Sequence, residues 1–323
     1  MKYSGLTDAQ KVQYFHEGWV MVSDIFTDVD LQPVRDEITA VIHGAAQRLI
    51  AEDKLSRSYE EEPFETRLTR IFAETEEILP PIVGRAGGGH SGPAFFEFIT
   101  HPALLAKMES LVGREIVGSS VYRIRPKIPG YSRGAVPWHQ DSGYFSPHCD
   151  DDLIVTCWIP LVDTNAENGC LRVLPRAHRQ GVLTHHTQGP GGYLWITEED
   201  RPTRIEPITV PVPARGALLM TNLTPHMSTQ HSVDIVRWAI DVRYQSATVP
   251  NNVGELPADF DSNRPDEEIA CYAPEADFVV QSEEHPESVV SGWGKFNELR
   301  QRFETDRPTG PQRGWVPAET QEA

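Results

Sequence analysis

The sequence predicts a mainly β fold, a sandwich or barrel of short strands with helices packed beside it. The first third of the chain has a helical pattern, and after Glu115 it changes to short β-branched and aromatic runs separated by Gly, Pro and Asn-Gly. Many short strands at such spacing are typical of a sandwich or barrel, and no repeat of the propeller or solenoid kind is visible. The 323 residues could form one large domain or two small ones, and we interpret them as one.

The helical pattern begins at Thr7 and ends near Glu52, with one extended interruption at Trp19–Val22. Thr27 is a candidate helix cap and Gly18 a candidate helix stop. Pro at a first turn and a closing Gly indicate another helix after residue 100. The expected helices are Asp8–Gly18, Thr27–Leu49, Pro102–Val112 and, near the other end of the chain, Trp293–Phe303.

Five β-branched or aromatic runs follow the helical part. They divide the single expected domain, residues 1–323, into a mainly helical buttress (1–114), a β core (115–250) and a C-terminal segment (251–323). This last segment is rich in Pro, Asp and Glu, and we expect a wrap around the core or a partly mobile tail. The expected strands are Val117–Arg125, Leu153–Leu161, Cys170–Leu174, Ala217–Met220 and Val236–Tyr244.

Composition excludes several classes of protein. Apolar residues make up 39% of the chain and charged residues 24%, as in an ordinary globular enzyme. The 47 acidic residues outnumber the 29 basic ones, and a net charge of −18 repels nucleic acids and anionic membranes. No signal peptide and no run of about 20 apolar residues are visible, so we expect a cytoplasmic protein. The four cysteines lack metal or disulfide spacing and are expected to be free thiols.

A His-x-carboxylate pair indicates a metal site. His139 and Asp141 are separated by one residue, and on a strand such side chains share a face. Two imidazoles and one carboxylate on one side of a metal form the facial triad of non-haem Fe(II) oxygenases. With twelve histidines in the chain the pattern alone is weak, and His148 and Asp150 repeat it. His139 lies in an apolar setting, whereas His148 lies in a run of acidic residues that is typical of a solvated loop.

The second imidazole is expected from a later strand, and both His226 and His231 are candidates. Arg237 follows them on a strand whose other face is apolar, so its side chain points either into the barrel or toward solvent. Inside, it needs an anion, and a dicarboxylate cosubstrate fits because guanidinium binds carboxylate bidentately. On a solvated face it would instead have Asp241 and Arg243 further along the strand as neighbours. Arg243 is expected to pair with Asp241 or to face solvent, and to matter little for the site. An alternative register pairs His231 with Arg243.

Taken together, these segments resemble the phytanoyl-CoA dioxygenase family of Fe(II)/2-oxoglutarate-dependent oxygenases. The resemblance fades beyond Pro250. The residues that carry it are Tyr14–Val20, Arg123–Lys127, Trp138–Asp141, Leu153–Trp158, Asn168–Pro175, His226–Ser228, Arg237–Trp238 and Asp241–Gln245. The family fold is a double-stranded β-helix, a cupin-like jelly roll, in agreement with the expected sandwich and flanking helices.

The resemblance also implies a set of site residues. The family places its distal histidine eleven residues before the cosubstrate arginine and a serine two after that histidine; His226, Ser228 and Arg237 match, and His231 does not. The implied iron ligands, which are also the catalytic residues, are His139, Asp141 and His226. Arg237 with Ser228 is implied to hold the far carboxylate of 2-oxoglutarate, and Arg125 and Trp158 to line the cavity.

The implied activity is hydroxylation of a small organic molecule, using Fe(II), 2-oxoglutarate and O2 and releasing succinate and CO2. Asp141 disfavours halogenation, because halogenases of the wider superfamily have a small residue there. Desaturation, epoxidation and rearrangement stay open. Two alternatives remain: a metal-binding cupin without 2-oxoglutarate chemistry, which would not need Arg237 and Ser228 at this spacing, and a catalytically silent binding protein, which would usually lack a ligand.

The expected partner is a small-molecule substrate such as a natural product, an amino acid or a lipid-like compound. The acidic balance disfavours an acyl-CoA. Residues 84–90 and 189–196 have the composition of mobile lids, where specificity commonly resides. No motif in the sequence fixes the oligomeric state.

Overall fold

Two antiparallel β-sheets form the centre of the structure, a computed structural model that describes residues 3–84, 90–119, 122–131, 134–145, 147–248, 277–305 and 313–319. The larger sheet has the strand order β1-β7-β4-β9-β2-β10, with β3 paired to β9, and the smaller has the order β6-β5-β8. The strands are β1 (Trp19–Val22), β2 (Ile116–Ser119), β3 (Arg123–Ile124), β4 (Ile154–Pro160), β5 (Leu171–Val173), β6 (Ile208–Val210), β7 (Ala217–Thr221), β8 (His226–Ser228), β9 (Ala239–Ser246) and β10 (Asp277–Gln281).

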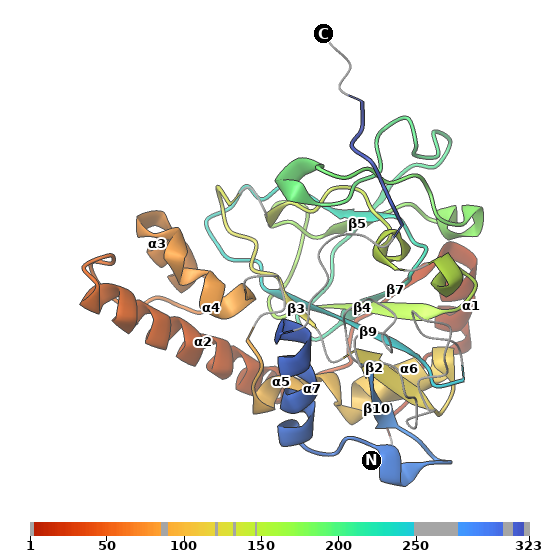
Figure 1. Ribbon diagram of the computed structural model, residues 1–323, viewed down its shortest axis with the longest axis horizontal. Coiled ribbons are helices and arrows are strands. Elements are labelled where there is room, and N and C mark those ends of the chain that lie inside the picture. Colours follow the sequence, from red (N-terminus) through yellow and green to blue (C-terminus); the bar gives the residue numbers. More distant parts are fainter. Residues whose placement is uncertain are drawn as a thin grey trace.

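The α-helices lie mainly in the N-terminal third, as predicted. Figure 1 shows α2, α5 and α7 together at one side of the large sheet and β5 of the small sheet at the opposite side. None of the described helices is long and apolar enough to cross a membrane. The helices are α1 (Asp8–Glu17), α2 (Asp28–Ala51), α3 (Arg67–Glu74), α4 (Pro80–Val83), α5 (Pro93–Ile99), α6 (Pro102–Val112) and α7 (Trp293–Thr305).

The predicted helix ends are confirmed by their caps. Thr7 and Thr27 both form capping boxes: the threonine side chain accepts from the backbone N–H three residues on, and the threonine's own backbone N–H donates to that residue's side chain. Gly18 ends α1 in the left-handed region at φ 87°, which glycine adopts without strain. The short helices α3, α4 and α5 were not predicted. α5 has only seven residues, of which four are buried apolar groups, so it is too short for an amphipathic period to mark it in the sequence.

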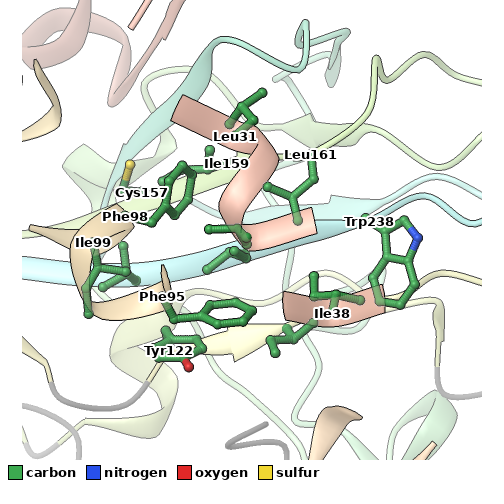
Figure 2. Close-up of a cluster of buried hydrophobic side chains, with 14 of the residues drawn as sticks. Leu31, Ile38, Phe95, Phe98, Ile99, Tyr122, Cys157, Ile159, Leu161 and Trp238 are labelled. Carbon is green, nitrogen blue, oxygen red and sulfur yellow. The ribbon is translucent and has the colours of Figure 1, made fainter. Parts of the chain in front are cut away.

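The main core lies between these helices and the outer face of the large sheet. Figure 2 shows Leu31 and Ile38 of α2, Phe95 of α5 and Ile159 of β4 in one cluster of buried side chains. Along β9 every second residue, such as Ile240, points into this core. Burial of these apolar side chains holds the helices on the sheet.

The inner faces of the two sheets enclose a second, smaller core. Trp158 of β4 and Leu218 of β7 pack here against Val173 of β5 and Val210 of β6. On β9 the residues that alternate with the outer ones, Asp241 among them, also point inward and are buried although charged. The predicted alternation of this strand is therefore confirmed, and its polar face lines the space between the sheets.

Two predicted strands have different bounds in the structure. The run Val117–Arg125 is not one strand, because β2 pairs with β9 and β10 whereas β3 pairs with β9 further along. The run Val236–Tyr244 becomes regular strand only from Ala239. Arg237, just before it, makes an isolated bridge with Lys127. Because the two residues are directly opposed in this bridge, the side chains of Arg237 and Lys127 lie on the same face of the strand pair.

The C-terminal part of the chain contributes to the sheet and to the loops above it. β10 adds an edge strand by pairing with β2, which was not predicted, and α7 confirms the predicted late helix. Residues 313–319 pass beside the loop near Thr187, which bridges Pro317 (Figure 1, dark blue). Residues 249–276, which include most of the Pro-, Asp- and Glu-rich stretch and Cys271, lie outside the described residues.

Candidate metal centre

Three predicted ligands come together between the sheets. His139 and His226 exchange backbone hydrogen bonds of 3.0 and 2.9 Å, and their ring centroids are 4.2 Å apart. Asp141 Oδ1 lies 3.9 Å from His139 Nε2. All three side chains are buried, and one ligand atom of each lies within 4.8 Å of the other two. Two imidazoles and one carboxylate at this separation can hold a single metal ion on one side and leave its other positions open.

The His-x-Asp pair is not on a regular strand, which corrects part of the prediction. His139 is extended and bridges His226, but Asp141 already begins a 3₁₀ turn, Asp141–Tyr144. Between them Gln140 is extended, with φ −113° and ψ 146°, and that one residue suffices to direct both ligands to the same side. Its own side chain points the other way and donates to the carbonyls of Gly181 and Leu223.

Both imidazoles are oriented by backbone carbonyls. His139 Nδ1 lies 2.8 Å from the oxygen of Pro137, and His226 Nδ1 lies 3.0 Å from that of Thr224. A carbonyl only accepts, so each Nδ1 carries the proton and each Nε2 keeps its lone pair. The pKa of His139 is lowered to about 3, first because burial disfavours the charged ring and then because His226 lies beside it. The ring is neutral, as a metal ligand must be.

The carboxylate is held through one of its two oxygens. Asp141 Oδ2 accepts a hydrogen bond from the hydroxyl of Thr156 and another of 3.2 Å from Arg243 Nε. Burial alone would raise the pKa of Asp141, but Arg243 and both histidines stabilise the anion and hold that pKa well below its usual range. Oδ1, the oxygen nearer the histidines, remains for a metal.

Arg243 therefore has a different role from the one predicted. It was expected to pair with Asp241 or face solvent, with little effect on the site. It does lie 3.8 Å from Asp241, but it is buried and also binds the carboxylate of Asp141. Asp241 in turn accepts from Arg125 Nε at 2.9 Å, so carboxylates and guanidinium groups alternate across the inner face.

A pair of buried cations lies beside the triad. Arg237 is 3% exposed, and its Nε has no hydrogen-bond partner among the described residues. Lys127, which sequence reasoning missed as a site residue, is 2% exposed and donates to Ser228 Oγ at 2.9 Å. The described ion pairs include no carboxylate that faces either cation. The signal that could have identified Lys127 is its bridge with Arg237. That bridge becomes visible only after the strands are paired, so the sequence did not reveal it.

Burial and a nearby positive charge lower the pKa of each of the two cations. Burial, followed by the charge of Arg237, lowers the pKa of Lys127 to about 7. Burial, followed by the charge of Arg125, lowers the pKa of Arg237 to about 10, so its guanidinium stays charged at neutral pH. An anion bound between them would favour the charged form of both groups. A buried pair of basic side chains that has no carboxylate among the described ion pairs is a candidate anion site.

The remaining cavity predictions, Arg125 and Trp158, also lie near this place. The Arg237 guanidinium carbon lies 5.3 Å from the centre of the Trp158 ring, a cation–π distance. Arg237 Nη1 donates to the backbone oxygen of Arg125 at 3.4 Å. The Arg125 side chain itself is 31% exposed and paired with Asp241. The structure thus brings both residues next to Arg237.

Other histidines are engaged away from the triad. His231, the alternative ligand, directs Nε2 to the carbonyl of Ile235. His185 and His186 point to different partners: His185 Nε2 accepts from the backbone N–H of Gln140, and His186 Nε2 lies 2.8 Å from Asp200.

The structure describes the whole of the second predicted lid region but only the ends of the first. The side chain of His148 and residues 85–89 of the first predicted lid lie outside the described part of the chain. In the second, Leu194 donates to the Tyr144 hydroxyl at 3.1 Å, next to the ligand turn.

A buried triad of this composition between two antiparallel sheets defines a mononuclear metal site in a jelly-roll protein. The chain belongs to the phytanoyl-CoA dioxygenase (PhyH) family, whose model matches residues 15–239. That matched region contains the triad, Lys127, Ser228 and Arg237.

Named relatives and solved structures agree with this assignment. The chain is 27% identical to human peroxisomal phytanoyl-CoA dioxygenase over 56% of its length and 50% of the relative's. It is 25% identical to ectoine dioxygenase from Bordetella bronchiseptica, over 56% and 53%. It thus spans about half the length of these curated relatives. The crystal structure of EvdO2 from Micromonospora carbonacea complexed with 2-oxoglutarate has the same fold, with a TM-score of 0.50 at 20% identity over 76% of this chain and 94% of that one.

The contacts of Arg243 lead to a first prediction. Replacing a residue that orients a metal ligand typically weakens metal binding about 10- to 100-fold. We expect a loss of that size for a divalent metal in Arg243→Met, because Asp141 Oδ2 loses a charged partner. The control is Arg48→Met, which removes a 55% exposed side chain. Anaerobic metal titration measures both, and equal affinities in wild type and Arg243→Met would contradict the assigned role.

Proposed function

We propose that this protein is an Fe(II)- and 2-oxoglutarate-dependent dioxygenase that hydroxylates a small organic molecule and releases succinate and CO2. The observation that carries the proposal is the buried pair Arg237 and Lys127 beside an open two-histidine, one-carboxylate site. A plain metal-binding cupin has no use for two unneutralised cations at this position. A dicarboxylate cosubstrate supplies the missing negative charge and a chelating end for the metal.

The chain's own residues fit the metal. His139 and His226 would offer Nε2 and Asp141 would offer Oδ1, because their other polar atoms are already engaged. When bound, iron supplies activation of O2 with oxidative decarboxylation of 2-oxoglutarate. The presence of Asp141 supports hydroxylation over halogenation, since its carboxylate takes the place that a halide would need.

The residues around the cations fit the far carboxylate. His226 and Ser228 are two residues apart on β8, so their side chains share a face at a separation of about 6–7 Å. Ser228 Oγ accepts from Lys127 Nζ and, at 3.0 Å, from the backbone of Val136. Both contacts use its lone pairs, so its hydroxyl proton is available to donate to a carboxylate. Arg237 would add a bidentate contact and Trp158 would cover one side of it.

The substrate is proposed to be a small molecule that enters beside Arg125, whose side chain is partly exposed next to the site. The names of the two relatives refer to different compounds, phytanoyl-CoA and ectoine. A screen of candidate compounds, read as succinate formed above the level without substrate, tests the hydroxylase assignment. If no compound raises succinate although the cosubstrate binds, the catalytically silent alternative is favoured.

Iron binding depends on His226 and not on His231 in this proposal. In His226→Ala only two of the three protein ligands remain. This variant should therefore not bind Fe(II) when the metal and the protein are present at nearly equal concentrations. His231→Ala should bind nearly as wild type does, because its Nε2 is directed to a backbone carbonyl. Anaerobic Fe(II) titration compares the two variants. The opposite pattern would disprove the ligand assignment.

Arg237 separates 2-oxoglutarate chemistry from simple metal binding. Arg237→Ala removes a charge-assisted bidentate contact of roughly 1.5–3 kcal/mol, so we expect about 10- to 150-fold weaker 2-oxoglutarate binding. Iron affinity should barely change. Arg237→Lys should recover only part, because an ammonium lacks the planar fork. The readout is the visible charge-transfer band of the anaerobic Fe(II) protein during cosubstrate titration.

The control for Arg237 is Arg215→Ala, since the Arg215 side chain is 52% exposed. Unchanged 2-oxoglutarate affinity in Arg237→Ala would remove the main support for the cosubstrate. Absence of the band in wild-type protein with bound iron would favour the plain cupin.

Lys127 makes cosubstrate binding depend on pH. With its pKa near 7 before the anion binds, Lys127 is charged below that pH and neutral above it. We expect 2-oxoglutarate affinity to be greatest below pH 7 and to fall as pH rises, by at most about tenfold per unit for one proton. Lys127→Met should flatten this dependence. Titrations from about pH 6 to about pH 9 measure it, and the same slope in both proteins would exclude Lys127 as its source.

A further inference from the structure

Residues 313–317 lie against the turn that carries Asp141. Trp315 Nε1 donates to the carbonyl of Gly143 at 2.7 Å. Arg313 Nε donates to the carbonyl of Phe145 at 2.8 Å, and its Nη2 pairs with the carboxylate of Asp150. These contacts join segments about 170 residues apart in the sequence, as the dark blue trace in Figure 1 shows.

The same segment is fixed to a second loop behind the turn. Thr187 donates its backbone N–H to the carbonyl of Val316 at 3.1 Å. The Trp315 ring lies against His185, with centroids 5.4 Å apart. His185 Nε2 accepts from the backbone N–H of Gln140 at 2.9 Å. Gln140 stands between the ligands His139 and Asp141. The imidazole of His185 therefore connects the Trp315 ring to the backbone between the two ligands.

The imidazole packs closely against the turn. A Cβ placed on Gly143 would lie 2.6 Å from His185 Nε2, closer than real contacts, so only glycine lets the ring approach. Nδ1 of His185 lies 2.8 Å from the carbonyl of Leu183 and carries the proton. Burial lowers the pKa of His185 to about 4, which keeps the ring neutral and its Nε2 an acceptor.

The turn needs such external partners. A 3₁₀ turn of four residues satisfies few of its own backbone groups, and its hydrogen bonds are weaker than those of a longer helix. Within it Gly143 donates to Gln140 and Phe145 donates to Ser142, but the carbonyls of Gly143 and Phe145 point outward. Trp315 and Arg313 supply the donors for these two carbonyls. Without these donors, the two carbonyls would have to accept hydrogen bonds from water instead.

We propose that residues 313–317 form a strap that fixes the ligand turn, with Trp315 as a positioning residue for the metal site. The strap lies outside residues 15–239, the part that matches the family model, so it is a feature of this chain beyond the shared core. The expected effect of the strap on metal affinity rests on the proposed metal-binding function. Its effect on the turn itself does not depend on that function.

The test compares Trp315→Ala, Trp315→Phe and Trp293→Ala, the last a 36% exposed tryptophan of α7 as the matched control. We expect Trp315→Ala to bind Fe(II) about tenfold or more weakly in anaerobic titration, as for other groups that orient metal ligands. Hydrogen exchange of backbone amides in residues 140–150 should become faster, while the thermal unfolding midpoint stays close to that of wild type. Trp315→Phe keeps an aromatic ring but loses the indole N–H, so its metal affinity and its amide exchange should lie between those of wild type and Trp315→Ala.

Unchanged metal affinity and unchanged amide exchange in Trp315→Ala would overturn the proposal. So would an equal loss in Trp293→Ala, or a fall in unfolding midpoint large enough to explain the loss of affinity. If Trp315→Ala fails to fold, Trp315→Phe decides by the same measurements. If the wild-type protein binds no iron, the proposed function fails, and faster exchange of residues 140–150 in the variants would still support the strap.

Discussion

The paired backbone hydrogen bonds between His139 and His226 connect the two halves of the site. They join the segment that carries His139 and Asp141 to β8, which carries His226 and Ser228. Because directly opposed residues of an antiparallel pair point the same way, this one bridge directs both imidazoles to a common point. The placement of Ser228 follows from the same strand. A change of register by one residue would turn these side chains to the opposite face.

Charge inside the sandwich follows two different patterns. Arg125, Asp241, Arg243 and Asp141 alternate in sign, so each buried charge has a partner, as buried charges generally require. Arg237 and Lys127 have no such partner among the described ion pairs, although both are buried. The contrast separates the groups that hold Asp141 from the pair that we propose binds the cosubstrate. It also explains why we expect different consequences when Arg237 and Arg243, six residues apart on the same face, are replaced.

The matched family region holds the ligands, and contacts from outside it complete their surroundings. Arg243 and Trp315 both lie beyond residue 239. The first holds the carboxylate of Asp141, and the second holds the turn that follows it. Both act on the same ligand because Asp141 stands where extended backbone changes into a 3₁₀ turn, which has few hydrogen bonds of its own. The histidines need less support, since backbone carbonyls only two residues away orient them.

The sequence by itself determined the mainly β class and the capped helices, because these depend on local periodicity and on end signals. Its spacings left His226 and His231 both open as ligands, and the resemblance to the family implied the set His139, Asp141, His226, Ser228 and Arg237. It could not determine which of two arginines on the same strand face meets the metal ligand, nor that Lys127 joins Arg237. It missed α5, because a helix of seven residues is too short to show a clear amphipathic period, and it placed Asp141 on a strand. Those features depend on contacts between residues about 90 to 170 positions apart, such as the bridges of His139 and Lys127 and the bond from Trp315. Only the folded chain brings these partners together, and the pairing of strands, rather than any local pattern, decides which side chains meet.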